Sequence, residues 1–449
     1  MKNIFIIAIS VLLLSACGKK LNINPQQSVD ENIVFTSDAN IKSALRGAYD
    51  VVSGASLVGG DLQMYSELLG ANGEITWAGT YQQPREIFRK TMLTTNSFLR
   101  DTYTDAYKAI NICNNIIESI DIVNEGDRDH VKGQALFLRG LMYFELVKLF
   151  ALPYSAGNTS SNPGLQLITV PTKNGEVSDA NKKPRSSVEE TYQQIINDLT
   201  TAKSLMEDQI GVYAGKYTAA AVLSRVYLQM ADYQKAAQEA NDVIENSGAS
   251  LESDCRKAFN NSSPSSEDIY VMPVTPQDGS NDMWLFWSIG DYGARDGDVE
   301  VDQKQIDLFA SGDQRLGWFY IDESDIYRSA KWQFQYRYLP VIRLAEMYLT
   351  RAECNARLGT SIGATADEDL NDVIRARAGL GAVSATVDNI IYERRLELVD
   401  EGQKIHDIRR LKQSVDGFQY NDNKLVCPIP QREVDAGNGI LTQNPGYNP

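Results

Sequence analysis

Histidine is scarce in this chain, and its cysteines form no close pairs. The 449 residues include two histidines, His130 and His406, and five cysteines. Apart from Cys17, the cysteines are scattered: Cys113, Cys255, Cys354 and Cys427. Zinc sites and dithiol redox motifs need such ligands at short, regular spacing, so neither is indicated. Cys113 and Cys354 lie in helical patterns, so we expect buried free thiols and no required disulfide.

Positive charge is also in short supply. The chain has 59 acidic and 43 basic residues, a formal net charge of -16 at pH 7. This balance disfavours nucleic acid and anionic lipid surfaces as partners. The sequence contains no nucleophile elbow, phosphate-binding loop or zinc-protease helix, and therefore gives no support for an enzyme. It also lacks a linker rich in proline, glycine and serine, so we expect a single domain over residues 41–449.

Apolar runs long enough to span a membrane are missing as well. The N-terminal apolar stretch, Ile4–Leu14, has eleven residues, whereas a membrane-spanning helix needs about 20. Lys2 precedes this stretch and Leu14-Ser15-Ala16-Cys17 closes it, which is typical of a bacterial lipoprotein signal. We expect residues 1–16 to be removed and Cys17 to carry acyl chains that hold the protein to a membrane. The polar residues 17–40 are then a tether.

Hydrophobic periodicity predicts a mainly α-helical fold. Helices are expected over residues 41–52, 103–120, 136–150, 188–202, 218–230, 233–245, 344–349 and 369–378. Ser187 and Glu190 have the spacing of a capping box, and Thr218 is placed to cap the helix that it begins. The hairpins that start near residues 218 and 344 share the pattern Leu-x-x-x-Tyr-Leu, which matches tetratricopeptide spacing. We therefore expect a tetratricopeptide-like helical repeat superhelix with irregular, loop-rich insertions.

Several longer motifs are spread along the chain. They are Pro184-Arg185-Ser186-Ser187, Asp313-x-Arg315, Arg343-Leu344-Ala345-Glu346-Met347-Tyr348-Leu349 with Arg351-Ala352-Glu353, Asn371-Asp372-Val373-Ile374-Arg375-Ala376-Arg377-Ala378-Gly379-Leu380, Glu393-Arg394-Arg395-Leu396-Glu397-Leu398 with Glu401-Gly402, Pro428-Ile429-Pro430, and Gln443-Asn444-Pro445-Gly446-Tyr447. In these motifs the chain resembles the SusD/RagB family of Bacteroidota outer-membrane nutrient-binding lipoproteins.

The resemblance implies a fold, a place and a partner. It implies a SusD-like α-helical body with an N-terminal part of about 41–215 and a C-terminal part of about 216–449, which contains a ligand-loop insertion of about 249–332. The protein is then expected at the outer membrane, exposed on the cell surface and seated on a SusC-like TonB-dependent barrel. Its expected role is to capture an oligosaccharide or polysaccharide and deliver it to that transporter.

Two aromatic and polar stretches are candidates for sugar binding, which needs flat apolar faces beside groups that pair with hydroxyls. The first runs over residues 72–85 and the second over residues 281–295. The candidate ligand-binding residues are Trp77, Tyr81, Arg85, Trp284, Trp287 and Tyr292. We expect Trp77 and Tyr81, which glycines flank, to form an exposed platform. Trp318 and Trp332 are assigned to packing.

The role of the charged residues and the identity of the ligand can also be interpreted in other ways. Glu393, Glu397 and Glu401 would share a helix face, as the carboxylates of a surface glycoside hydrolase could, but interleaved arginines favour structural ion pairs. The acidic side chains between residues 291 and 302 could hold a structural calcium ion, although they lack a regular loop spacing. Otherwise no cofactor and no metal are predicted. Two further hypotheses for the function are peptide capture, as by a RagB-like protein, and a purely structural lid on the transporter.

Overall fold

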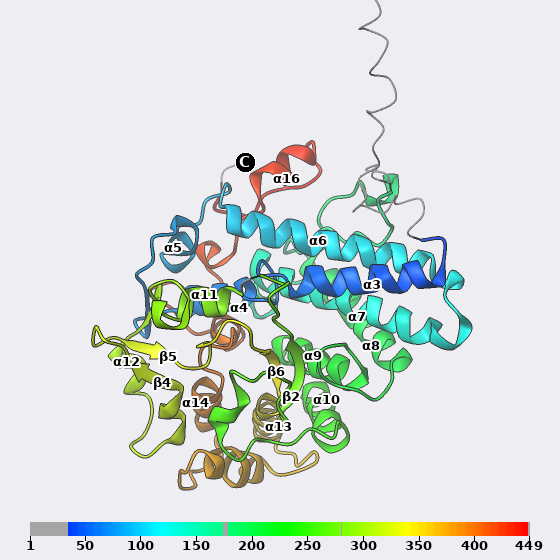
Figure 1. Cartoon of the computed structure of the whole chain (residues 1–449). Coiled ribbons are helices and arrows are strands. Elements are labelled where there is room, and N and C mark those ends of the chain that lie inside the picture. The colour runs from blue at the N-terminus through cyan, green and yellow to red at the C-terminus, as the bar shows by residue number, and fades with distance from the viewer. Residues whose placement is uncertain (1–34, 174–177, 280, 448–449) are drawn as a thin grey trace, which may run out of the picture.

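The structure is a computed structural model that describes residues 35–173, 178–279 and 281–447. Cys17 and most of the predicted tether lie outside these ranges. The long helices are α3 (Asp38–Ser53), α6 (Ser97–Glu118), α7 (Glu125–Phe150), α8 (Val188–Leu205), α9 (Lys216–Gln229), α10 (Tyr233–Asn246), α13 (Leu344–Leu358) and α14 (Val387–Glu397). Each helix from α6 to α10 packs on the next, and α10 packs on α13 (Figure 1). This stack of helical hairpins confirms the predicted mainly α, tetratricopeptide-like fold.

The centre of the stack is α7, which is buried almost all round because α3, α6, α8 and α9 pack against it. Its charged residues are buried with partners. Arg139 lies 2.7 Å from the Asp198 carboxylate of α8, and Lys148 lies 2.9 Å from Glu145. The prediction of a core helix in this region is therefore confirmed. No helix among the described residues is long and apolar enough to cross a membrane.

The helix ends test the capping predictions. Ser187 and Glu190 form the expected capping box at the start of α8. The prediction for Thr218 is wrong, because α9 begins at Lys216 and its N-cap is Gly215. The Thr218 hydroxyl accepts from the Gly215 amide and donates to the carbonyl of Ile269, so it ties α9 to a strand. The helix expected over residues 369–378 is a π-helix over Glu368–Arg375.

Short strands and helices make up the rest of the molecule, and many of them lie on the left in Figure 1. One antiparallel sheet has the order β1-β3-β5-β4 and the other pairs β2 with β6. The strands are β1 (Ile75–Trp77), β2 (Asp268–Met272), β3 (Val299–Val301), β4 (Phe319–Ile321), β5 (Tyr327–Ser329) and β6 (Leu339–Arg343). The short helices are α4 (Asp61–Gly70), α5 (Gln82–Phe88), α11 (Asp282–Trp287), α12 (Gln303–Ile306), α15 (Lys404–Arg410) and α16 (Gln431–Ala436).

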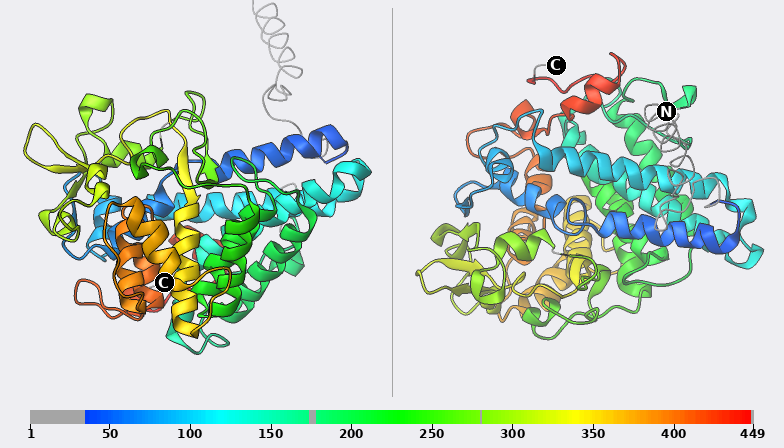
Figure 2. Two further views of the ribbon diagram at one scale, coloured as in Figure 1. Left: turned by 90° about the horizontal axis from the view of Figure 1, so that it is seen from below. Right: turned by 45° about the horizontal axis from the view of Figure 1, so that its top comes forward.

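The pairing of β1 with β3 decides where the candidate site lies. Ile75 is opposite Val301 and Trp77 is opposite Val299, so segments more than 200 residues apart in sequence become neighbours. Two further views show that the loop-rich segment containing β3, β4 and β5 gathers on one side of the helical body (Figure 2). The four cysteines of the described chain are buried free thiols, which agrees with the burial predicted for Cys113 and Cys354.

Candidate functional site

The two aromatic stretches predicted from the sequence meet in space around Phe286 of α11. The Tyr81 ring lies 5.8 Å from the Phe286 ring, and the Trp77 ring lies 5.5 Å from it, measured between centroids. Phe98, at the start of α6, packs against Tyr81 at 5.9 Å. The first and second stretches therefore form one surface, which we call the Tyr81 surface. It comprises Tyr81, Arg295 and the polar hollow beside them.

Tyr81 is the exposed aromatic residue of this surface. It immediately precedes α5 and is 41% exposed. The Arg295 guanidinium lies over the ring, 4.6 Å from its centroid, in the geometry of a cation–π contact. Arg295 also donates to the Asp298 carboxylate at 2.6 Å and to the Thr80 hydroxyl at 2.9 Å. The hydrogen bond to Asp298 raises the pKa of Arg295, so the side chain is a fixed cation against a partly exposed ring.

A polar hollow of about 310 Å³ adjoins the ring. It is lined by Ala78, Gly79, Thr80, Arg295, Asp296, Gly297, Asp298 and Glu300. The amides of Ala78 and Gly79 both donate to the carbonyl of Asp298, at 2.8 and 3.2 Å, which draws the two loops together. A Cβ atom on Gly79 would lie 2.3 Å from the Asp298 carboxylate, so this close approach requires glycine. The hollow offers carboxylates and a hydroxyl to a polyhydroxylated ligand.

The prediction of an exposed Trp77 is wrong. Successive side chains of a strand point to opposite sides, and Trp77 shares the inward side of β1 with Ile75. Trp77 is 5% exposed, whereas the hydroxyl of Thr76 between them donates to Asp302 at 2.8 Å. The flanking glycines mark a tight loop rather than an exposed ring.

The two tryptophans of α11 are also buried. Trp284 is 4% exposed and Trp287 is fully buried, because α4 and β3 both pack against this short helix. The indole N–H of Trp284 donates to the carbonyl of Tyr292 at 3.3 Å and so positions the loop that follows. Arg85 is half-buried and donates to the carbonyl of Gly79. These residues support the Tyr81 surface from below, and neither tryptophan offers an open face to a ligand.

Tyr292 belongs to a second aromatic group. Its ring packs against Phe334 at 5.4 Å and against Tyr320 at 6.1 Å. Phe334 and its neighbour Tyr336 are each 40% exposed. Neither was singled out from the sequence, although the alternation of aromatic and polar residues over 331–338 was the signal for them. Trp318 and Trp332 are buried, which confirms their assignment to packing.

Three of the acidic side chains that suggested a calcium site have partners within the protein. Asp298 pairs with Arg295, Asp302 accepts from Thr76, and Glu300 lies 4.0 Å from Arg328. In the described part of the chain, no group of three or more histidine, cysteine or acidic residues is arranged to hold a metal ion.

The glutamates of α14 and its C-terminal flank take part in ion pairs. Glu393 lies 2.5 Å from Arg315, and Glu397 pairs with Arg343 at 3.3 Å. Glu401 lies 2.6 Å from both Arg343 and Lys331. All of these contacts are within the protein core, which supports the structural interpretation of the three carboxylates.

Comparison with known proteins agrees with this architecture. Residues 149–426 match the SusD family, and residues 21–228 match a family described as "Starch-binding associating with outer membrane". The chain is 27% identical to SusD-like protein P2 of Formosa agariphila, over 97% of this chain and 98% of that protein.

Solved structures show the same fold. A SusD superfamily protein from Bacteroides thetaiotaomicron has a TM-score of 0.80 and 25% identity, covering 91% of this chain and all of that one. A laminarin-binding SusD-like protein has a TM-score of 0.77 and 22% identity, covering 92% of this chain and all of the other. Because the SusD match spans more than half of the sequence, the chain belongs to the SusD family.

Proposed function

We propose that this protein is a lipid-anchored, carbohydrate-binding protein of the outer membrane that captures oligosaccharide or polysaccharide on the Tyr81 surface. The observation that carries the proposal is the exposed Tyr81 ring, held between Phe98, Phe286 and Arg295 beside a hollow lined with carboxylates. A sugar ring presents C–H groups that pack on an aromatic face and hydroxyls that need hydrogen-bond partners. The Tyr81 surface offers both within a few ångströms.

Membership of the SusD family supports the same ligand class. One relative of the same fold is named for binding laminarin, and the N-terminal family match is described as starch-binding. The ion pairs of Glu393, Glu397 and Glu401 support binding without hydrolysis, because these carboxylates are buried and neutralised by cations.

The proposal also includes a lipid anchor for the protein and a transporter that receives the glycan. Cys17 follows a lipoprotein signal, and we propose that its acyl chains hold the body at the cell surface beside a SusC-like TonB-dependent transporter, which receives the captured glycan. The description of the matched family as associating with the outer membrane supports this location. Mass spectrometry of the mature N-terminal peptide tests whether Cys17 carries acyl groups.

Calorimetric titration with polysaccharides tests the site. We expect laminarin or starch to bind the wild-type protein, and Tyr81→Ala to weaken binding about tenfold, the loss of about 1.4 kcal/mol expected for truncation of an anchoring aromatic side chain. Tyr213→Ala is the matched control, since Tyr213 is 48% exposed and packs edge-on against Tyr49 of α3. Binding of peptides but of no polysaccharide would contradict the proposal, as would equal effects of the two substitutions.

A further inference from the structure

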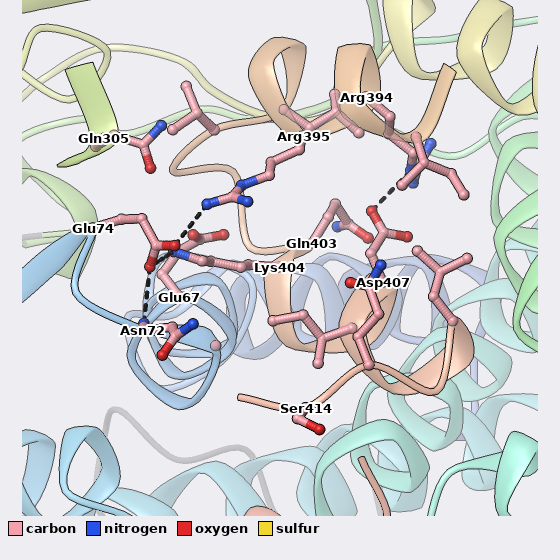
Figure 3. Close-up of a pocket in the computed structure, with 17 residues that line it drawn as sticks. Glu67, Asn72, Glu74, Gln305, Arg394, Arg395, Gln403, Lys404, Asp407 and Ser414 are labelled. Atoms are coloured by element: carbon pink, nitrogen blue, oxygen red, sulfur yellow. Dashed lines mark hydrogen bonds and ion pairs between the residues drawn. The ribbon is translucent and has the colours of Figure 1, made fainter. Parts of the chain in front are cut away.

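A second cavity lies behind β1, between α4, α12, α14 and α15 (Figure 3). Its volume is about 130 Å³. A water molecule needs roughly 10–15 Å³ on this measure, so the cavity has room for on the order of ten waters or for one small organic molecule. We call it the Glu74 cavity, after the carboxylate that its cations surround.

Three cations surround the single carboxylate of Glu74. Arg395 of α14 lies 2.6 Å from it and Lys404 of α15 lies 3.1 Å from it (Figure 3). Lys304 of α12 lies 3.8 Å from it. The backbone amide of Asn72 donates to the same carboxylate at 2.9 Å. Burial alone would raise the pKa of Glu74, but Lys404, the Asn72 amide and Arg395 lower it to about 2. Glu74 is therefore ionised, and the local charge is still positive by two.

The other acidic groups of the wall do not cancel this excess. Asp407 is paired with Arg394 at 2.9 Å. Burial raises the pKa of Glu67 to about 8, so this carboxyl is mainly protonated at neutral pH. A region of positive charge within a protein of net charge -16 favours an anionic ligand.

An unpaired donor also lines the cavity. Gln305 is 2% exposed, and its side-chain N–H₂ group has no hydrogen-bond partner among the described residues. A buried donor without a partner costs about 1–3 kcal/mol, which a ligand oxygen could recover. Arg395, whose side chain is 40% exposed, has Glu74 as its only hydrogen-bond or ion-pair partner among the described residues, so further N–H groups are available to a ligand.

Part of the remaining wall is apolar and comes from Ile391, Leu398, Ile408 and Leu411, beside polar side chains such as Gln403 and Ser414. We infer that the Glu74 cavity binds a small organic carboxylate, whose oxygens contact Arg395, Lys404 and Gln305 while its C–H groups pack on this apolar wall. The inference goes beyond the proposed function, because it concerns a different cavity and a charged ligand. A sugar acid and a simpler carboxylate share this chemistry.

Calorimetric titration of the full-length protein tests the inference, with sodium glucuronate, sodium acetate and glucose as probes at constant ionic strength. We expect a carboxylate to bind saturably and neutral glucose not to bind at this site. Glucuronate binding more tightly than acetate would identify a sugar acid, and equal binding a simple carboxylate. If no carboxylate binds, the proposal for the Tyr81 surface still stands, since that site is tested with neutral polysaccharides and its own variant.

Two substitutions locate the ligand. Arg395→Gln and Gln305→Leu should each weaken carboxylate binding, the former by about tenfold or more. Arg89→Gln is the matched control, because Arg89 is exposed and its side chain has no partner within the described chain. The inference is overturned if neither carboxylate binds, if glucose competes as well as glucuronate, or if Arg395→Gln and Arg89→Gln have the same effect.

Discussion

Two buried carboxyl groups lie at the first residues of α4 and α11, which pack against each other. Asp61 begins α4 and Asp282 begins α11, the helix that carries Phe286. Asp61 accepts from the Tyr65 hydroxyl at 2.7 Å, and the negative charge of Asp282 is close enough to disfavour its ionisation. Burial raises the pKa of both groups, that of Asp282 to about 6, and the charge of Asp282 raises that of Asp61 further.

Asp282→Asn should remove a pH dependence of stability. In the wild type the folded pKa lies above the unfolded value of 3.8, so folding is favoured below about pH 4 and this contribution is lost as the pH rises through about 6. The loss is about 3 kcal/mol for a shift of this size. Relative to the wild type, Asp282→Asn should therefore become more stable between about pH 4 and 7, measured by urea denaturation.

The exposed residue Asp291 provides the control for this experiment. Asp291→Asn should leave the difference from wild type constant across the same pH range. A difference between Asp282→Asn and wild type that does not change with pH would show that burial does not raise the pKa of Asp282.

The sequence showed which stretches contain the residues of the site, but not which of their side chains are exposed. The sequence identified residues 72–85 and 281–295, and these stretches do meet at Phe286. Whether an aromatic side chain points inward depends on the partner of its strand or helix. For Trp77 that partner is β3, and for Trp287 it is α4, and neither contact is visible in local sequence.

At the scale of single elements, the C-terminal end of α7 shows how remote segments complete a helix. The last carbonyls of a helix have no partner within it. In α7 the carbonyl of Leu149 accepts from the Cys427 amide, and that of Phe150 accepts from Asn444 and Arg185. Arg409 of α15, fully buried, donates to the carbonyls of Lys148 and Ala151 at 2.6 and 2.8 Å.

Arg409→Met should destabilise the protein through this helix end. It leaves two buried carbonyls without donors, at a cost of about 1–3 kcal/mol each. We therefore expect the free energy of unfolding to fall by about 2–6 kcal/mol in urea denaturation. Arg409→Lys keeps the charge but not the fork of N–H groups, and should be intermediate. Wild-type stability in Arg409→Met would contradict this account of the helix end.

Helix boundaries were predictable where they depend on residues that are close in sequence. The capping box at Ser187 and the end of α7 before Pro153 were both predictable, since each depends on neighbours in sequence. The start of α9 was predicted two residues late, because Thr218 bonds to the carbonyl of Ile269 in β2. The π-helix at Glu368–Arg375 also had no local sequence signal that we identified.

At the scale of the whole molecule, a buried network of charges joins distant parts of the chain. Arg343 at the end of β6 contacts Glu267, Glu397 and Glu401. Glu397 of α14 also pairs with Arg315 and Arg377. The family motifs that were recognisable in sequence supply most of these residues, and the network explains physically why the motifs combine arginine with glutamate.

Glu397→Gln should destabilise the whole protein, because it leaves three arginines without their shared carboxylate. Breaking a buried ion pair costs about 3–5 kcal/mol. Burial would raise the pKa of Glu397, but Arg377, Arg343 and Arg315 lower it to about 2. Its contribution is therefore present above the unfolded value of 4.5 and is lost as the pH falls toward about 2.

Urea denaturation at pH 7 and at about pH 3 measures both effects. The loss of stability in Glu397→Gln should be large at pH 7 and smaller at low pH. Glu323→Gln is the control, since Glu323 is exposed and has no partner within the described ranges. An equal, small effect of the two substitutions would mean that the network does not stabilise the fold.

The pairing of β1 with β3 also determines when, during synthesis of the chain, the Tyr81 surface can form. Synthesis runs from the N-terminus, so Tyr81 leaves the ribosome more than 200 residues before Arg295 and Asp298, which complete the surface around it. Until α11 has been made, Trp77 lacks the packing of Phe286, and until β3 has been made, β1 lacks its neighbour. A chain that ends before residue 301 therefore has no Tyr81 surface, however well its N-terminal helices fold. The protein can bind at this surface only after about two thirds of the chain has been synthesised.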